Sequence, residues 1–95
     1  MDYRNALTDR LMEAVLSLES QEEAYAFFED LLTISELKSL SQRLEVADML
    51  QHRKTYQEIG QITGVSTATI SRVNRALLYG RGGYASVLSR LTQEP

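Results

Sequence analysis

Hydrophobic residues recur at steps of three and four positions along almost the whole chain, which is the period of an amphipathic helix. No segment shows the strict alternation expected of a strand. The single proline is residue 95, so no internal proline interrupts a helix. The pattern therefore predicts an all-α fold of about six helices. Their expected ranges are 2–19, 21–32 and 35–52, a helix-turn-helix over 55–79, and a final helix over 83–92.

Serine residues mark the expected starts of the second and third helices. The Ser20 hydroxyl can cap a helix whose first turn is acidic, as the dipole prefers. Ser35 is the expected cap of the long helix over 35–52. Lys38 stands where a full capping box needs Glu or Gln, so that box is incomplete.

The long helix carries more apolar surface than so short a chain can cover. Its leucines and alanine are spaced by three and four like a heptad seam, and further apolar residues widen the stripe. A chain of 95 residues buries a smaller share of its surface on folding than a larger domain does. We therefore expect a homodimer with a shared core, in preference to a monomeric bundle.

The composition excludes several classes of protein. The length fits a single domain, 1–95, and the absence of cysteine removes disulfides, thiolate metal sites and cysteine nucleophiles. No apolar run is long enough to cross a bilayer, and Met1–Arg4 lacks the pattern of an export signal. No nucleophile–base pair or metal-ligand spacing is visible. We expect a cytoplasmic protein that is not an enzyme, with no cofactor, no metal and no membrane contact.

The net charge of −3 is unevenly distributed along the chain. Residues 1–34 carry −6, residues 35–50 carry −1, and residues 51–95 carry +4. An acidic first half therefore masks a basic second half, and this positive charge favours a nucleic-acid interface there.

The segment 55–79 has the sequence features of a helix-turn-helix. Thr55 and Glu58 form a complete capping box for its first helix, and Ser66 can cap its second. Gly64 stands where the first helix ends, a position that often needs a positive φ. Gly60 is expected where the crossing helices bring their backbones together.

The second helix of this pair has the profile of a helix that enters the major groove. Its inner positions are apolar, and its outer positions are small at the start and basic further along. Such a helix brings its first residues to base edges and its arginines to phosphates. The predicted partner is therefore double-stranded DNA. The predicted contacts are Lys54, Tyr56, Gln57, Ser66, Thr67, Ala68, Ser71, Arg72, Asn74 and Arg75.

These residues resemble a known family. The segment 31–77 resembles the core of the tryptophan repressor, and the whole chain is similar to the YerC/YecD type of Trp-repressor-like proteins. The resemblance rests on Leu31-Leu32-Thr33 with Glu36, on Leu40, Arg43 and Leu50, and above all on Ala68-Thr69-Ile70-Ser71-Arg72. It implies an all-helical, intertwined homodimer that presents two helix-turn-helix units to a palindromic operator.

The resemblance also implies a position for a small-molecule effector. In the tryptophan repressor the indole lies between two arginines, with threonines and a glycine nearby. The matching positions here are Thr33, Arg43, Thr69 and Arg72, but Val73 replaces the glycine. Because its branched side chain would fill the space left for the indole, tryptophan is not the expected effector. For Arg43 and Arg72 we favour ion pairs or phosphate contacts over an unknown small-ligand site.

We therefore expect a sequence-specific DNA-binding transcriptional regulator, a repressor, in which residues 1–52 dimerise and 55–79 bind DNA. The short side chains at the start of the second helix favour water-bridged and shape-dependent readout. Two alternatives remain: a protein-protein interaction module that uses the same helix pair, and a regulator gated by an effector other than tryptophan.

Overall fold

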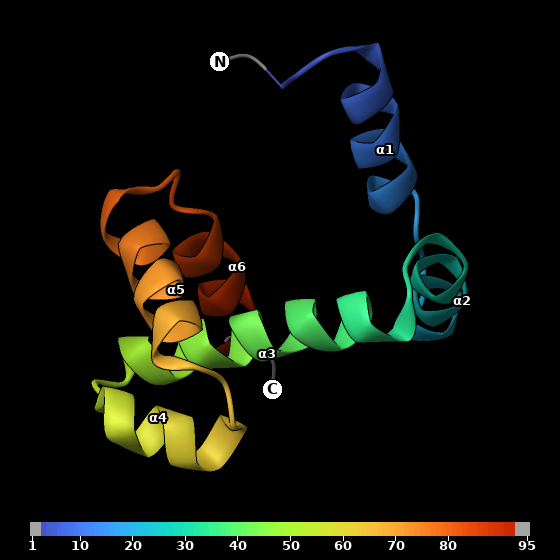
Figure 1. The fold of residues 1–95 in the computed structure, drawn as a ribbon. Coiled ribbons are helices and arrows are strands. Elements are labelled where there is room, and N and C mark those ends of the chain that lie inside the picture. Colours follow the sequence, from blue (N-terminus) through green and yellow to red (C-terminus); the bar gives the residue numbers. More distant parts are fainter. Residues whose placement is uncertain (1–2, 93–95) are drawn as a thin grey trace. The chain divides into compact units, whose positions relative to one another are not determined.

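The computed structural model describes residues 3–92, which form six α-helices and contain no strand (Figure 1). The predicted all-α fold of six helices is therefore confirmed. The residues up to Leu37 form one compact unit, and those from Lys38 onward form a second. The helices are α1 (Ala6–Leu16), α2 (Gln21–Leu31), α3 (Ile34–Gln51), α4 (Tyr56–Thr63), α5 (Thr67–Tyr79) and α6 (Gly83–Thr92).

Helix α1 begins at Ala6, later than predicted, because Asn5 caps it. The Asn5 side chain accepts hydrogen bonds from the backbone N–H groups of Leu7 and Thr8. The Thr8 hydroxyl oxygen in turn accepts one from the backbone N–H of Asn5, at 2.8 Å. Apolar residues at helical spacing also occur before this cap, so periodicity alone placed the start of the helix too early. Asp2, the first residue of the expected range, lies outside the described residues.

Ser20 caps α2 as predicted, and its side-chain oxygen accepts the backbone N–H of Glu23 at 3.1 Å. Neither α1 nor α2 contains a buried residue. Leu7 is 80% exposed and Leu16 is 84% exposed. Both helices thus leave apolar side chains exposed within one chain.

The prediction that Ser35 caps α3 is wrong. Helix α3 begins at Ile34, and Thr33 precedes it in a complete capping box with Glu36. The Glu36 carboxylate accepts the Thr33 backbone N–H at 2.8 Å, and the Thr33 hydroxyl oxygen accepts the Glu36 N–H at 3.1 Å. A cap with a matching glutamate satisfies two first-turn donors, whereas Ser35 followed by Lys38 satisfies one.

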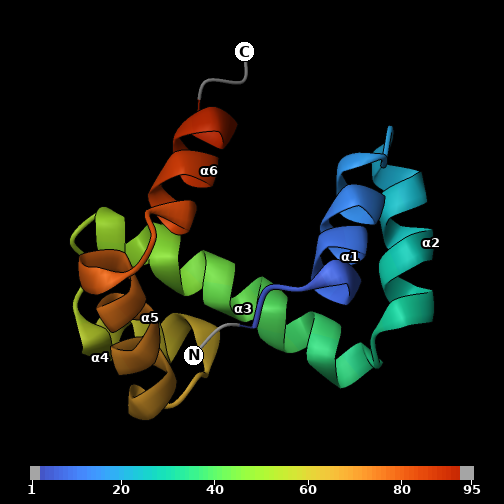
Figure 2. The same cartoon turned by 90° about the horizontal axis from the view of Figure 1, so that it is seen from above.

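The second unit holds the hydrophobic core. Figures 1 and 2 show α4, α5 and α6 gathered around the C-terminal half of α3. All four helices contribute to one cluster, which fixes the helix-turn-helix against the end of α3 and against α6. Its buried members are Val46, Ala47, Met49, Ile59, Ile70, Val73 and Leu88.

Candidate nucleic-acid interface

Helices α4 and α5 form the predicted helix-turn-helix, and the predicted caps hold both helix starts. Thr55 and Glu58 make the complete capping box of α4, with hydrogen bonds of 2.9 and 3.1 Å. Ser66 caps α5 by accepting the backbone N–H of Thr69 at 3.2 Å. Gly64 ends α4 with φ of 75°, the left-handed conformation that glycine adopts without strain.

The structure does not require a glycine at position 60. A Cβ at this position would lie 3.9 Å from the carbonyl oxygen of Val65, an ordinary van der Waals distance. The two helices therefore leave room for a methyl group at position 60. Of Gly60 and Gly64, only Gly64 has a backbone conformation that favours glycine.

Three buried side chains join α4 and α5 into a rigid pair. Ile59 of α4 is completely buried, and Ile70 and Val73 of α5 are 1% and 2% exposed. Because Val73 belongs to this core, the side of α5 that faces α3 and α4 is already filled by the protein itself.

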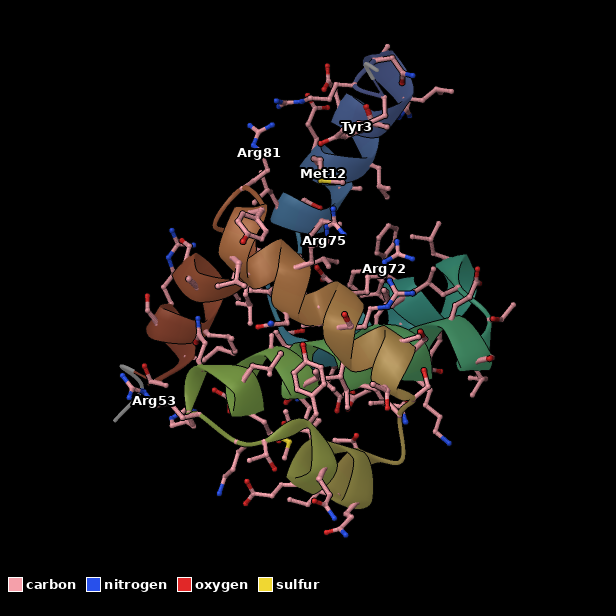
Figure 3. All side chains as sticks on the ribbon, turned by 60° about the vertical axis from the view of Figure 1, so that its left-hand side comes forward. Tyr3, Met12, Arg53, Arg72, Arg75 and Arg81 are labelled. Atoms are coloured by element: carbon pink, nitrogen blue, oxygen red, sulfur yellow. The ribbon has the colours of Figure 1, made fainter. Side chains whose placement is uncertain are left out.

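The opposite side of α5 is exposed. Ala68, Ser71, Arg72 and Arg75 are all exposed, and at 100° per residue they share one face. Figure 3 shows Arg72 and Arg75 pointing away from α4. Neither arginine pairs with an acidic residue in the described part of the chain, so both guanidinium groups are available to phosphates.

Asn74 departs from the predicted outward face. It is half-buried, because it lies closer on the helix to the core residue Ile70 than to Arg72. The sequence pattern placed Asn74 on the outer face because it is a polar residue next to the inward-facing Val73.

The hydroxyl groups at the start of α5 are engaged in local hydrogen bonds. The Ser66 hydroxyl donates to the Thr69 hydroxyl oxygen at 3.1 Å while it accepts the Thr69 backbone N–H. Thr67 and Ser71 are exposed. The first-turn N–H groups of an α-helix have no intrahelical acceptor, so those of Thr67 and Ala68 can serve a phosphate oxygen.

The remaining predicted contacts lie at the start of α4. Lys54, Tyr56 and Gln57 are all exposed and surround the Thr55 cap. The pKa of Glu58 is lowered from its ordinary value, because its carboxylate accepts a hydrogen bond from the backbone N–H of Thr55 and is also hydrogen-bonded to the Thr55 side chain. The positive charge of nearby Lys54 lowers this pKa further. The carboxylate thus stays ionised and keeps the helix start in place.

The four predicted effector residues are not shown to form one site. Thr33 belongs to the first unit, and its hydroxyl serves the cap of α3. In the second unit Arg43 is half-buried and Arg72 is exposed, while the Thr69 hydroxyl oxygen accepts a hydrogen bond from the Ser66 hydroxyl.

Two features of the second unit were not predicted from the sequence. Arg53, at the end of α3, has φ of 62° although it is not a glycine. A mainly apolar groove of about 410 Å³ also lies between α3, the end of α5 and α6. Apolar spacing alone could not distinguish residues that line a groove from residues that fill a core. The lining residues are Leu44, Ala76, Gly80, Arg81, Gly83, Tyr84 and Val87.

Comparison with known proteins places this geometry in a family. Residues 6–92 match the profile of the family described as Trp repressor protein. The chain belongs to the Trp repressor family. Membership in this family supports a helix-turn-helix that binds DNA and a role in the regulation of transcription. The resemblance seen in the sequence is thereby confirmed.

Individual family members are also similar to the chain. A Bacillus subtilis protein named Uncharacterized protein YerC is 53% identical over 85 residues, which cover 90% of this chain and 82% of the relative. The crystal structure of a TrpR-like protein from Eubacterium eligens matches with a TM-score of 0.91 and 52% identity, over 97% of this chain and 95% of the other. A structure from Staphylococcus aureus, described as a candidate Trp repressor, matches with a TM-score of 0.91 and 50% identity, over 96% and 91% of the two chains. None of the helices formed by residues 3–92 is long and apolar enough to span a membrane.

Proposed function

We propose that the chain is a homodimeric, sequence-specific repressor that binds a palindromic operator through α4 and α5. The observation that carries this proposal is the exposed face of α5, where Arg72 and Arg75 follow the small residues Ala68 and Ser71 and have no acidic partner in the described part of the chain. Small residues allow the helix start to approach base edges, and the arginines lie where phosphates border the groove.

The residues proposed to contact DNA are those predicted from the sequence. Exposed positions around the two helix starts supply most of them, and Asn74 contributes from the edge of the exposed face. They are Lys54, Tyr56, Gln57, Ser66, Thr67, Ala68, Ser71, Arg72, Asn74 and Arg75.

The proposed dimer is supported by the apolar surface that each unit leaves uncovered. In the first unit, α1 and α2 bury no residue. In the second unit, the groove that Leu44, Tyr84 and Val87 help to line is open. A second copy offers apolar helices of the right kind to cover both surfaces, and residues 1–52 would supply most of that contact.

Selection of bound sequences from a pool of random duplexes tests the proposal. Two helix-turn-helix units related by a twofold axis should recover inverted repeats whose half-sites are about 34–36 Å apart, or one helical turn. The variant Arg72→Ala should bind the selected duplex more weakly. Its salt slope, which is the slope of the logarithm of the binding constant against the logarithm of the salt concentration, should be smaller in magnitude by about 0.9. Arg90→Ala, which removes an exposed arginine from α6, is the matched control and should leave the slope unchanged. A pool that shows no enrichment contradicts DNA recognition and favours a protein-interaction module.

A further inference from the structure

The end of α3 places an arginine where the chain elsewhere uses glycine. The Arg53 N–H donates to the Leu50 carbonyl oxygen and the Lys54 N–H to the Met49 carbonyl oxygen, both at 3.0 Å. These two bonds define a Schellman motif, whose left-handed position is usually glycine. Arg53 occupies that position with φ of 62°.

Glycine occupies the other left-handed positions of the described chain. The other two described residues with positive φ are Gly64, at 75°, and Gly82, at 78°. Glycine adopts this conformation freely, whereas a residue with a Cβ is strained in it. Arg53 is thus the one non-glycine among residues 3–92 that holds a left-handed conformation.

No contact within the described chain accounts for the arginine. Arg53 is exposed, is absent from the hydrophobic cluster, and forms no ion pair with a described acidic residue. Strain that no internal contact compensates points to a role for the side chain outside the chain.

The location indicates the kind of partner. Arg53 and Lys54 directly precede Thr55, the cap of α4, so two positive charges adjoin the positive end of that helix dipole. Figure 3 shows Arg53 beyond the end of α3, on a different side of the second unit from Arg72 and Arg75. In a helix-turn-helix the first helix crosses the DNA backbone beside the groove that the second helix occupies.

We propose that Arg53 binds a backbone phosphate flanking the groove that α5 enters, which lengthens the footprint of each half-site. The proposal rests on the proposed function, since it requires DNA binding by α4 and α5. Arg53 reads no base in this arrangement; it fixes the orientation of the helix-turn-helix on the duplex.

The substitution Arg53→Gly separates this role from a structural one. Because glycine relieves the backbone strain, the thermal midpoint should rise by a few degrees. Loss of one phosphate contact should lower the salt slope of binding to a selected duplex by about 0.9. Stability and affinity are therefore expected to move in opposite directions. Arg53→Lys keeps a positive charge at the same φ and should retain the wild-type slope.

The outcomes distinguish this proposal from the one it rests on. If the wild-type protein binds no duplex, the proposed function fails and the role of Arg53 fails with it. If the wild type binds and Arg53→Gly keeps both its slope and its affinity, the phosphate contact alone is overturned. Duplexes shortened one base pair at a time should show the wild type losing affinity at a longer length than Arg53→Gly. Equal length limits contradict the flanking contact.

Discussion

Single residues determine how the helix-turn-helix is built, and they do so through backbone conformation as well as packing. Gly64 has a positive φ, and Gly60 lies within α4 with space for a methyl group. The sequence shows the same residue type at both positions. The different requirements follow from the backbone angle at one and the neighbouring atoms at the other.

Alanine substitutions at these two glycines should have opposite effects on stability. Gly64→Ala places a Cβ in the left-handed region and should lower the free energy of unfolding by about 1 kcal/mol. Gly60→Ala, the matched control, should raise it by up to about 1 kcal/mol because alanine favours a helix interior. Urea unfolding at a fixed protein concentration measures both. Equal losses would show that the space beside Gly60 is smaller than the structure indicates.

Val73 sets the expected response to tryptophan. Its side chain is 2% exposed and packs in the core with Ile59 and Ile70, so no space for an indole remains at this position. Titration calorimetry of the wild-type protein with tryptophan should therefore detect no binding. Micromolar affinity would contradict this prediction.

The starts of α1, α3 and α4 are held by reciprocal caps between side chain and backbone. Thr55 with Glu58 was recognised in the sequence because the spacing and the following apolar run agree. The equivalent pair Thr33 with Glu36 was missed, because Ser35 offered a competing cap two residues later. Spacing identifies the residues that can cap, and the backbone geometry decides which of them does.

Because of the α4 cap, the stability of the folded protein should fall at acidic pH. The pKa of Glu58 is lowered in the folded state, so its stabilising effect is present above its ordinary pKa of 4.5. That effect is lost as the pH falls through the lower folded value. The pKa of Glu36 is lowered by the Thr33 cap in the same way, so wild-type stability should fall over this window.

The substitution Glu58→Gln isolates the contribution of α4. Glutamine keeps a capping oxygen but does not titrate, so the thermal midpoint of the variant should fall less steeply than that of the wild type below pH 4.5. Glu45→Gln, at an exposed position inside α3, is the matched control and should follow the wild-type curve. Parallel curves for Glu58→Gln and the wild type would exclude the cap as a source of the pH dependence.

The apolar surface of this protein exceeds what one chain covers. The buried core lies in the second unit, while the first unit buries no residue of α1 or α2. The apolar groove beside α6 adds to the uncovered area. Such surfaces on a small domain mark sites of association.

A charge in this groove should break the proposed dimer. Val87 is 45% exposed and lines the groove, so Val87→Asp should shift the protein from dimer to monomer. Ser86→Asp introduces the same charge at the neighbouring exposed position of α6, which does not line the groove, and should remain dimeric. Sedimentation equilibrium measures the mass of each. A monomeric wild-type protein would contradict the shared core.

Sequence patterns alone predict the helical class, the number of helices and the two caps of the helix-turn-helix. These depend on period and on residues three positions apart, which are local properties of the chain. The sequence also supplied the family, through residues such as Ala68-Thr69-Ile70-Ser71-Arg72.

The packing of the helices in three dimensions shows which side of each helix is covered and where the backbone is strained. It placed Asn74 at the edge of the core, showed space beside Gly60, and gave Arg53 a left-handed conformation. These properties depend on atoms from other helices or on the backbone angles at a helix end. Periodicity cannot reveal them, because it records only which residues of one helix share a face.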